Sequence, residues 1–265
     1  MRSPAVAGSF YPRSPEALRR QLDELFKEVG KVDEVQARGA VIPHAGYVYS
    51  GPVAAEVYAR LPRRDTYVIL GPNHTGLGAP VAMSTQTWET PLGSVEVDAD
   101  LAKAMAGTIV DQDETAHLRE HSIEVQLPFL QYRFSGFKIL PITMGLQDEE
   151  TAVEVGTALG QAIKGLGRSC TIIASSDFTH YEPQEVARST DAKLLEAVLN
   201  MDIPELYRRV YGLDATACGY GPISATITTS RILGAKTAKL LRYATSGDTS
   251  GDYSQVVGYS AVVFT

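Results

Sequence analysis

Three of the five histidines in the chain stand just beyond short apolar runs of the kind that form buried strands. They are His44 after residues 40–43, His74 after residues 67–70, and His180 after residues 170–174. The carboxyl ends of parallel strands meet at one edge of a sheet, and ligands of open α/β sheets bind in the crevice there. Imidazole is also the commonest side-chain ligand of transition metals. We therefore expect the three loops to converge on one metal-binding cleft.

Cys218 lies in the sequence ATACGYGP, a loop in which glycines allow the backbone to approach a ligand closely. This context favours a reactive or metal-binding thiol, whereas Cys170 opens an apolar strand and is expected to be buried. Thiolate joins imidazole at sites for softer metals. His44, His74 and Cys218 would form a site with three protein ligands and open positions for water, substrate or dioxygen.

The candidate catalytic residues beside such a metal are His180, His121 and Asp177. His180 is expected to donate or accept a proton at the open face of the metal, oriented by Asp177 or Glu120. Asp177 could instead cap the turn SSDFTHY, or fix the tautomer of a histidine. For His121, which stands at the start of a predicted helix, an acid–base role in the cleft and a structural hydrogen bond both remain open.

Other motifs point away from several common enzyme classes. HLREH places His117 and His121 four residues apart, but its glutamate is misplaced for the HExxH zinc-protease motif, and we expect His117 to be an exposed loop residue. SSD lacks the GxSxG elbow of serine hydrolases, and GPNHTGLG is neither GxGxxG nor a Walker motif. Aromatic residues flank the loops, and a cleft lined by them would suit a flat aromatic or apolar substrate. These residues are Tyr47, Tyr49, Trp88, Tyr181 and Tyr220.

The composition is that of an ordinary soluble globular protein, with 44% hydrophobic and 21% charged residues in 265. The net charge of −7 offers no basic patch for nucleic acid. No apolar run approaches the roughly 20 residues of a membrane-spanning helix, and the first residues lack the apolar centre of a signal peptide. Two cysteines are too few for a disulfide framework. We expect a cytoplasmic protein without affinity for nucleic acid or membranes.

Alternating strand and helix patterns predict one α/β domain over residues 1–265, a three-layer α/β/α sandwich around a mixed, mostly parallel sheet. Ser14 and Pro15 mark the start of the first helix, and Gly30 its end. The predicted helices cover residues 14–29, 52–61, 98–106, 121–134, 149–164, 184–200, 203–210 and 222–233. The predicted strands cover residues 40–43, 67–70, 80–84, 94–97, 137–142, 170–174, 239–244 and 256–264. Residues 80–84 and 94–97 would form a strand pair, with Trp88 between them, that covers or rims the cleft.

The order of the motifs resembles that of the Memo family, named after a mediator of cell motility. The shared motifs span nearly the whole chain: AGSFYP, IPHAGYVYSG, ILGPNHTG, TPLG, EHSIEVQLPFL, SSDFTHY and ACGYGPI. The resemblance implies a fold like the catalytic subunit of class III extradiol dioxygenases, which hold a mononuclear iron. It also implies that His44, His74 and Cys218 bind the metal, that Asp177 and His180 lie beside it, and that His121 lies in the same cleft. In prokaryotes the family is associated with a radical SAM protein, which implies a shared pathway.

One departure from the dioxygenases concerns their third ligand, a carboxylate, whose position here corresponds to Cys218. A thiolate makes the site softer and shifts its preference toward copper or zinc. The function expected first is a redox enzyme that uses iron(II), or copper, and resembles a dioxygenase. One alternative is a zinc-type hydrolase on the same ligands, with Glu120 or His180 activating water. The other is a non-enzymatic module that binds a peptide or partner in the inherited cleft.

Overall fold

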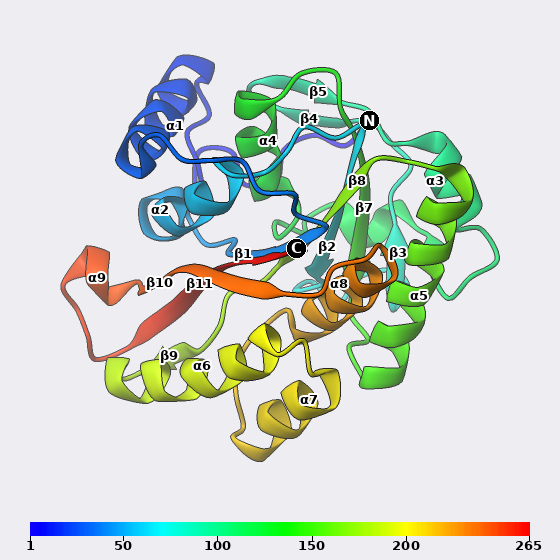
Figure 1. The fold of residues 1–265 in the computed structure, drawn as a ribbon. Coiled ribbons are helices and arrows are strands. Elements are labelled where there is room, and N and C mark those ends of the chain that lie inside the picture. The colour runs from blue at the N-terminus through cyan, green and yellow to red at the C-terminus, as the bar shows by residue number, and fades with distance from the viewer.

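The computed structural model describes residues 1–265 and shows a mixed β-sheet between two layers of helices (Figure 1). Along the sheet the strand order is β10-β11-β1-β8-β2-β7-β3-β6, and β9 pairs with β11. The strands are β1 (Gly39–Ile42), β2 (Thr66–Pro72), β3 (Val81–Met83), β6 (Asp111–Gln112), β7 (Lys138–Met144), β8 (Cys170–Ser175), β9 (His180–Glu182), β10 (Ala238–Thr245) and β11 (Val256–Phe264). The predicted α/β class with a central mixed sheet is confirmed.

Four parallel strands, β1, β8, β2 and β7, form the centre of the sheet. Antiparallel pairing begins at β11 on one side and at β3 on the other. Strands β1, β2 and β8 are buried at every residue because helices cover both faces of the sheet, and this explains their continuous apolar sequences. Since β8 lies between β1 and β2, the carboxyl ends of these three strands are neighbours.

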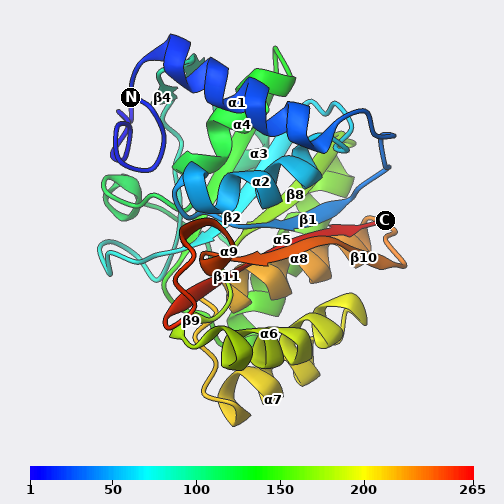
Figure 2. The same ribbon diagram turned by 90° about the vertical axis from the view of Figure 1, so that its left-hand side faces the viewer.

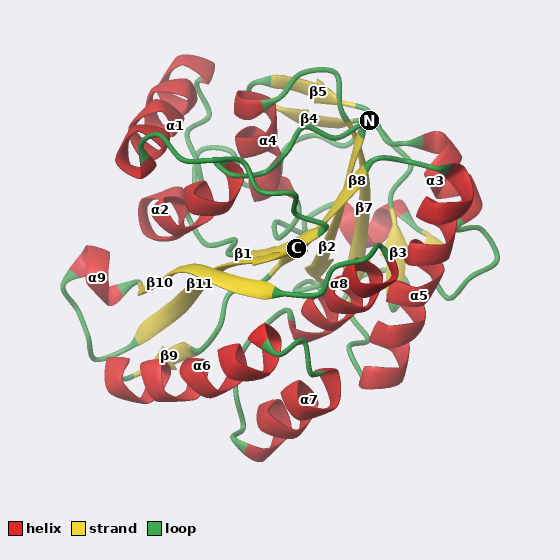
Figure 3. Ribbon diagram, viewed as in Figure 1, coloured by secondary structure: helices red, strands yellow, loops and turns green.

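The helices form one layer on each face of the sheet, as Figures 2 and 3 show. One layer contains α1 (Pro15–Val29), α2 (Tyr47–Tyr58) and α4 (Leu127–Arg133). The other contains α5 (Glu149–Leu166), α6 (Gln184–Leu199), α7 (Ile203–Gly212) and α8 (Tyr220–Ile232). Shorter elements are α3 (Ala99–Ala104), α9 (Gly247–Ser250), the 3₁₀ turns η1 (Glu114–His117) and η2 (Glu124–Gln126), and the hairpin of β4 (Trp88–Thr90) and β5 (Gly93–Val95). None of the helices is long and apolar enough to cross a membrane.

Local signals place several of these elements as the sequence predicts. The Ser14 hydroxyl accepts a hydrogen bond from the backbone N–H of Ala17 at the start of α1, and Gly30 ends the helix with a φ of 72°. Helix α5 packs closely on α8 at Gly156, where an added Cβ would lie 2.5 Å from the carbonyl oxygen of Ala225. One continuous core of 67 buried apolar residues connects the sheet to both helical layers.

Two local predictions were wrong. The predicted helix over 121–134 is helical only from Leu127, after the turn η2, because the Glu120 carboxylate accepts the first N–H groups of this stretch. The predicted pair of 80–84 with 94–97 does not form. Strand β3 joins the main sheet beside β7, and β5 pairs with β4 instead. Trp88 on β4 is fully buried, so it does not rim a cleft.

Candidate metal centre

Three histidines meet at the carboxyl ends of the central strands. His44 follows β1, His74 follows β2, and His121 lies between η1 and η2. One ligand atom from each histidine lies within 4.8 Å of the other two. The ring centroids are 5.2 Å apart for His44 and His74, and 4.6 Å apart for His74 and His121. His44 is buried at the base of this group and His74 is 33% exposed, so an ion between them would remain accessible from solvent.

Hydrogen bonds fix the tautomer of His44. Its Nδ1 lies 3.0 Å from the Ser175 hydroxyl at the end of β8. That hydroxyl donates its proton to the carbonyl oxygen of Ser122, at 2.6 Å, and accepts the Nε2–H of Gln126, at 2.7 Å. The Ser175 oxygen can therefore only accept from His44, so Nδ1 carries the ring proton. The lone pair of His44 is consequently on Nε2.

Glu120 orients His74 in the same way. Its fully buried carboxylate accepts the Nδ1–H of His74 at 2.9 Å and the backbone N–H of His74 at 2.5 Å. It also accepts the backbone N–H groups of His121 and Ser122. Burial alone would raise the pKa of Glu120, but the hydrogen bonds from His74 and Ser122 outweigh it and lower the pKa to about 2. The carboxylate is therefore ionised, and the Nε2 of His74 is free to bind a metal.

Cys218 lies next to His44, in the loop that precedes α8. Its Sγ is 3.3 Å from the Nε2 of His44, the nitrogen that carries the lone pair. Close approach depends on Gly219, where an added Cβ would lie 2.6 Å from the Cβ of Ser176. Burial raises the pKa of the Cys218 thiol. The thiol is therefore protonated at neutral pH in the absence of a metal and would lose its proton on binding one.

Asp177 and Cys218 are linked through the backbone just after β8. The N–H of Asp177 donates to the Sγ of Cys218 at 3.3 Å, and the Asp177 carboxylate accepts the backbone N–H of His44 at 2.8 Å. The other carboxylate oxygen lies 3.9 Å from the Nε2 of His44. Burial raises the pKa of Asp177 to about 7, despite the N–H groups of His44 and Ala45 that lower it. Asp177 can thus gain or lose a proton near neutral pH.

His180 begins β9 and is half-buried. Its Nδ1 donates to the carbonyl oxygen of Thr216 at 2.9 Å, and its backbone N–H donates to the Thr216 hydroxyl at 2.7 Å. Burial lowers the pKa of His180, and the charges of nearby His74 lower it further. Thr216, rather than Asp177 or Glu120, therefore orients the ring. The Nε2 of His180 carries the lone pair.

His117 is not an exposed loop residue, and that prediction was wrong. It is fully buried, its Nε2 donates to the carbonyl oxygen of Ala82 at 3.1 Å, and its Nδ1 has no partner. Burial lowers its pKa to about 4.

The flanking aromatic residues divide into two groups. Tyr47 and Trp88 belong to the core, whereas Tyr181 is exposed and has a positive φ of 60°.

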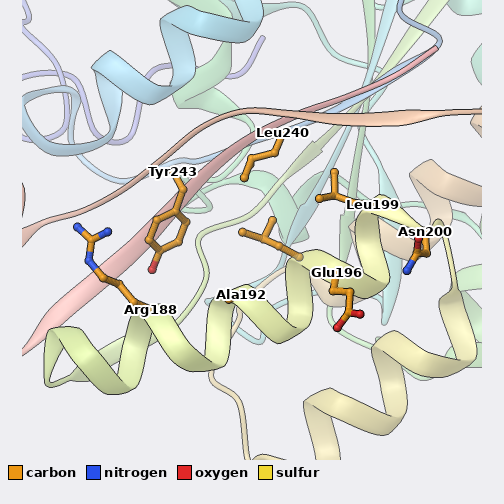
Figure 4. Close-up of a pocket in the computed structure, with 8 residues that line it drawn as sticks. Arg188, Ala192, Glu196, Leu199, Asn200, Leu240 and Tyr243 are labelled. Carbon is orange, nitrogen blue, oxygen red and sulfur yellow. The ribbon is translucent and has the colours of Figure 1, made fainter.

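A separate groove of about 620 Å³ lies between α6 and β10, away from the histidines. Figure 4 shows Leu240 and Tyr243 on the strand facing residues of the helix such as Ala192 and Leu199. None of the candidate metal or catalytic residues lines it. The groove is therefore distinct from the group of histidines at the strand ends.

The group of His44, His74 and His121 could hold a metal ion. The lone pairs of His44 and His74 are on Nε2, and the Cys218 thiol lies beside the Nε2 of His44 but outside that group of three. Sequence reasoning missed Ser175 and Gln126, the residues that fix the tautomer of His44. The signals for them are a serine ending the apolar run of β8 and a glutamine within the apolar run EVQLPFL.

Comparisons with known proteins agree with the fold and the motifs. The family model described as "Memo-like protein" matches residues 2–263. The chain is 57% identical over 264 residues to a MEMO1 family protein of Methanosarcina barkeri, with 99% of each chain covered. It is 58% identical to a MEMO1 family protein of Methanococcoides burtonii, again over 99% of each chain.

A more distant comparison concerns the fold alone. The crystal structure of an uncharacterized protein from Escherichia coli superposes with a TM-score of 0.57 at 13% sequence identity, covering 86% of this chain and 100% of that one. The extensive identity to the archaeal relatives and the full-length family match together show that the chain belongs to the Memo family.

Proposed function

We propose that this protein is a metal-dependent redox enzyme, similar to non-heme dioxygenases, with one ion held at the ends of β1 and β2. The observation that supports this most strongly is the group of ligand atoms from His44, His74 and His121, all within 4.8 Å of one another. Three separate segments of the chain supply these imidazoles. Hydrogen bonds orient His44 and His74 so that the lone pair of each ring is on Nε2. Packing of the core alone does not explain why three imidazoles converge with their ring nitrogens oriented in this way.

In this proposal His44 and His74 bind the ion whichever residue supplies the third ligand. Cys218, whose Sγ lies 3.3 Å from the Nε2 of His44, supplies the thiolate of the predicted ligand set, and His121 supplies a further imidazole. Iron(II) is the ion expected first, and copper or zinc are favoured if the thiolate binds. Bound iron or copper would supply electron transfer and a coordination position for dioxygen.

His180 and Asp177 are the proposed acid–base residues beside the ion. Because Nδ1 of His180 is held by the Thr216 carbonyl, its Nε2 can accept a proton from a substrate. The pKa of Asp177, about 7, allows the carboxyl group to hold or release a proton at neutral pH. Asp177 also positions His44 through its backbone N–H, so its replacement should affect both metal binding and catalysis.

The test is the metal content of protein purified anaerobically, with His44→Ala, His121→Ala and Cys218→Ala beside the wild type. Cys170→Ala is a matched control, because Cys170 is a buried thiol at the far end of β8. We expect about one equivalent of metal in the wild type and the control, and a large loss in His44→Ala. Equal metal in all five proteins would refute the proposal.

The two alternatives predict different outcomes. A zinc-type hydrolase would contain zinc and act without oxygen, but Glu120 is a poor water-activating base because four N–H groups occupy its carboxylate. A module without catalysis would bind its partner equally well after His44→Ala. The substrate, a small molecule or a peptide, and the link to a radical SAM protein stay predictions from the sequence.

A further inference from the structure

The loop that carries His121 has little regular structure of its own. Residues 117–126, called the site loop here, contain only the end of η1 and the single turn η2. The loop nevertheless supplies Glu120, which holds His74, and Gln126, which holds Ser175. Few backbone hydrogen bonds hold this loop, such as that from the N–H of Val125 to the carbonyl oxygen of His121. Side-chain contacts must therefore contribute to holding it within the tolerance of a metal site.

The side chain of Arg2 provides two of these contacts. It is 3% exposed, and its guanidinium donates to the carbonyl oxygens of His117, at 3.0 Å, and Glu120, at 2.7 Å. The same group lies over the ring of Trp88, 4.1 Å from the centroid. The rigid guanidinium therefore joins the end of η1 to Glu120, the residue whose carboxylate orients His74.

Glu124, which belongs to the site loop, binds further residues near the start of the chain. Its fully buried carboxylate accepts a hydrogen bond from Arg2, the backbone N–H groups of Ala5 and Val6, and the hydroxyl of Tyr11. All four donors come from residues 2–11, called the N-terminal segment here. Arg2 supplies the positive charge that compensates the buried carboxylate.

Phe10 contacts the site directly. Its ring packs on the ring of His121, with centroids 4.7 Å apart. Its carbonyl oxygen accepts the backbone N–H of Tyr47 at the start of α2, 2.8 Å away, which holds the backbone of Phe10 against α2. The N-terminal segment thus contacts the site loop at its two ends through Arg2 and Glu124, and at His121 through Phe10.

We propose that Arg2 and Phe10 are positioning residues of the metal centre. Arg2 acts through Glu120 on His74, and Phe10 acts on the ring of His121. This inference rests on the proposed metal site. Removing residues that orient metal ligands costs roughly 10- to 100-fold in metal affinity. The segment therefore contributes to affinity and coordination geometry, although none of its residues is a ligand.

The experiment is a titration of metal-free protein with Co²⁺, followed by its visible absorption, which reports both affinity and coordination geometry. The variants are Phe10→Leu and the double variant Arg2→Met/Glu124→Gln, which removes both members of the buried ion pair and leaves no uncompensated charge. Each has a matched control remote from the site. Phe26→Leu alters an aromatic cluster with Tyr132, and Arg242→Met/Glu28→Gln removes a surface ion pair.

We expect Co²⁺ affinity about 10-fold lower for Phe10→Leu and up to about 100-fold lower for the double variant, each with an altered absorption spectrum. The controls should keep the affinity and spectrum of the wild type. Folded variants with wild-type affinity and spectrum would overturn the inference. If the double variant does not fold, Phe10→Leu decides the result alone. Equal Co²⁺ binding by the wild type and His44→Ala would refute the proposed function instead.

Discussion

Replacing Glu120 with glutamine should lower the free energy of unfolding of the metal-free protein and the metal affinity of the proposed site. The carboxylate accepts four N–H groups, two from His74 and one each from His121 and Ser122. In the variant, the amide oxygen of glutamine can take the place of Oε1, which accepts from the His74 ring and from the backbone N–H groups of His121 and Ser122. The amide NH₂ group then replaces Oε2 and faces the backbone N–H of His74, so that two donors oppose each other.

The magnitude follows from the pKa of the carboxyl group. Its value falls from an ordinary 4.5 to about 2 in the folded protein, because the hydrogen bonds from His74 and Ser122 outweigh burial. Each pKa unit corresponds to about 1.4 kcal/mol, so the ionised group contributes about 3 kcal/mol to the free energy of unfolding. A folded-state pKa below the unfolded value gives stability that is complete above pH 4.5 and is lost as the pH falls to about 2. Glutamine does not titrate, so the variant lacks this contribution at every pH.

The assay is urea unfolding of metal-free wild type and Glu120→Gln over a range of pH. We expect the wild type to be more stable by about 3 kcal/mol at neutral pH, and the difference to shrink as the pH falls from 4.5 toward 2. Glu205→Gln is the control, because the pKa of Glu205 is also lowered to about 2, by Arg208 and Arg209 at the surface of α7. Solvent screens that pair, so its loss should change stability little. A difference for Glu120→Gln that stays constant with pH would refute the reasoning.

Further predictions concern residues on both sides of the site. Ser175→Ala removes the acceptor of the His44 ring proton and should lower metal affinity roughly 10-fold in a metal titration. Ser230→Ala is the control, because it removes a buried hydroxyl without a partner and should leave the metal affinity unchanged. Tyr181→Gly relieves a left-handed backbone and should raise the free energy of unfolding in urea by roughly 0.5–1 kcal/mol, and Asp214→Gly should gain less because aspartate tolerates that conformation. Either glycine variant being less stable than the wild type would contradict this. Metal binding should release about one proton from the Cys218 thiol at neutral pH, measured by calorimetry in buffers of different ionisation enthalpy, and Cys218→Ser should abolish that release. An unchanged release in Cys218→Ser would show that sulfur is not a ligand.

Strands and strand ends were predictable because their signals are local. The apolar runs before His44 and His74 are buried on both faces, and that burial requires a continuous apolar sequence. The true start of the helix predicted from residue 121 could not be predicted in this way. The apolar spacing includes His121 and Ser122, but the Glu120 side chain accepts their backbone N–H groups. Periodicity cannot report a competing hydrogen bond from a side chain in the same stretch.

The partners of the site residues were harder to predict, since they depend on contacts distant in sequence. Thr216 orients His180 from 36 residues away, and Arg2 reaches Glu120 across 118 residues. His117 was predicted to be an exposed loop residue, but both His117 and the nearby Glu120 are fully buried. A buried charged residue with its partners far along the chain is indistinguishable from a surface residue in the sequence alone.

The topology of the sheet limits how the ligand set can be completed. Because β8 lies between β1 and β2, the residues at its end stand between His44 and His74, and they serve as supports: Ser175 holds the His44 ring and Asp177 its backbone. In the proposed site a third ligand would therefore come from a loop. The site loop offers the imidazole of His121, and the loop before α8 offers the thiol of Cys218, 3.3 Å from the Nε2 of His44. An ion drawn toward Cys218 moves to a softer donor set, and one drawn toward His121 to nitrogen donors alone. In the proposed site, the preference among iron, copper and zinc would therefore depend on whether Cys218 or His121 completes the ligand set.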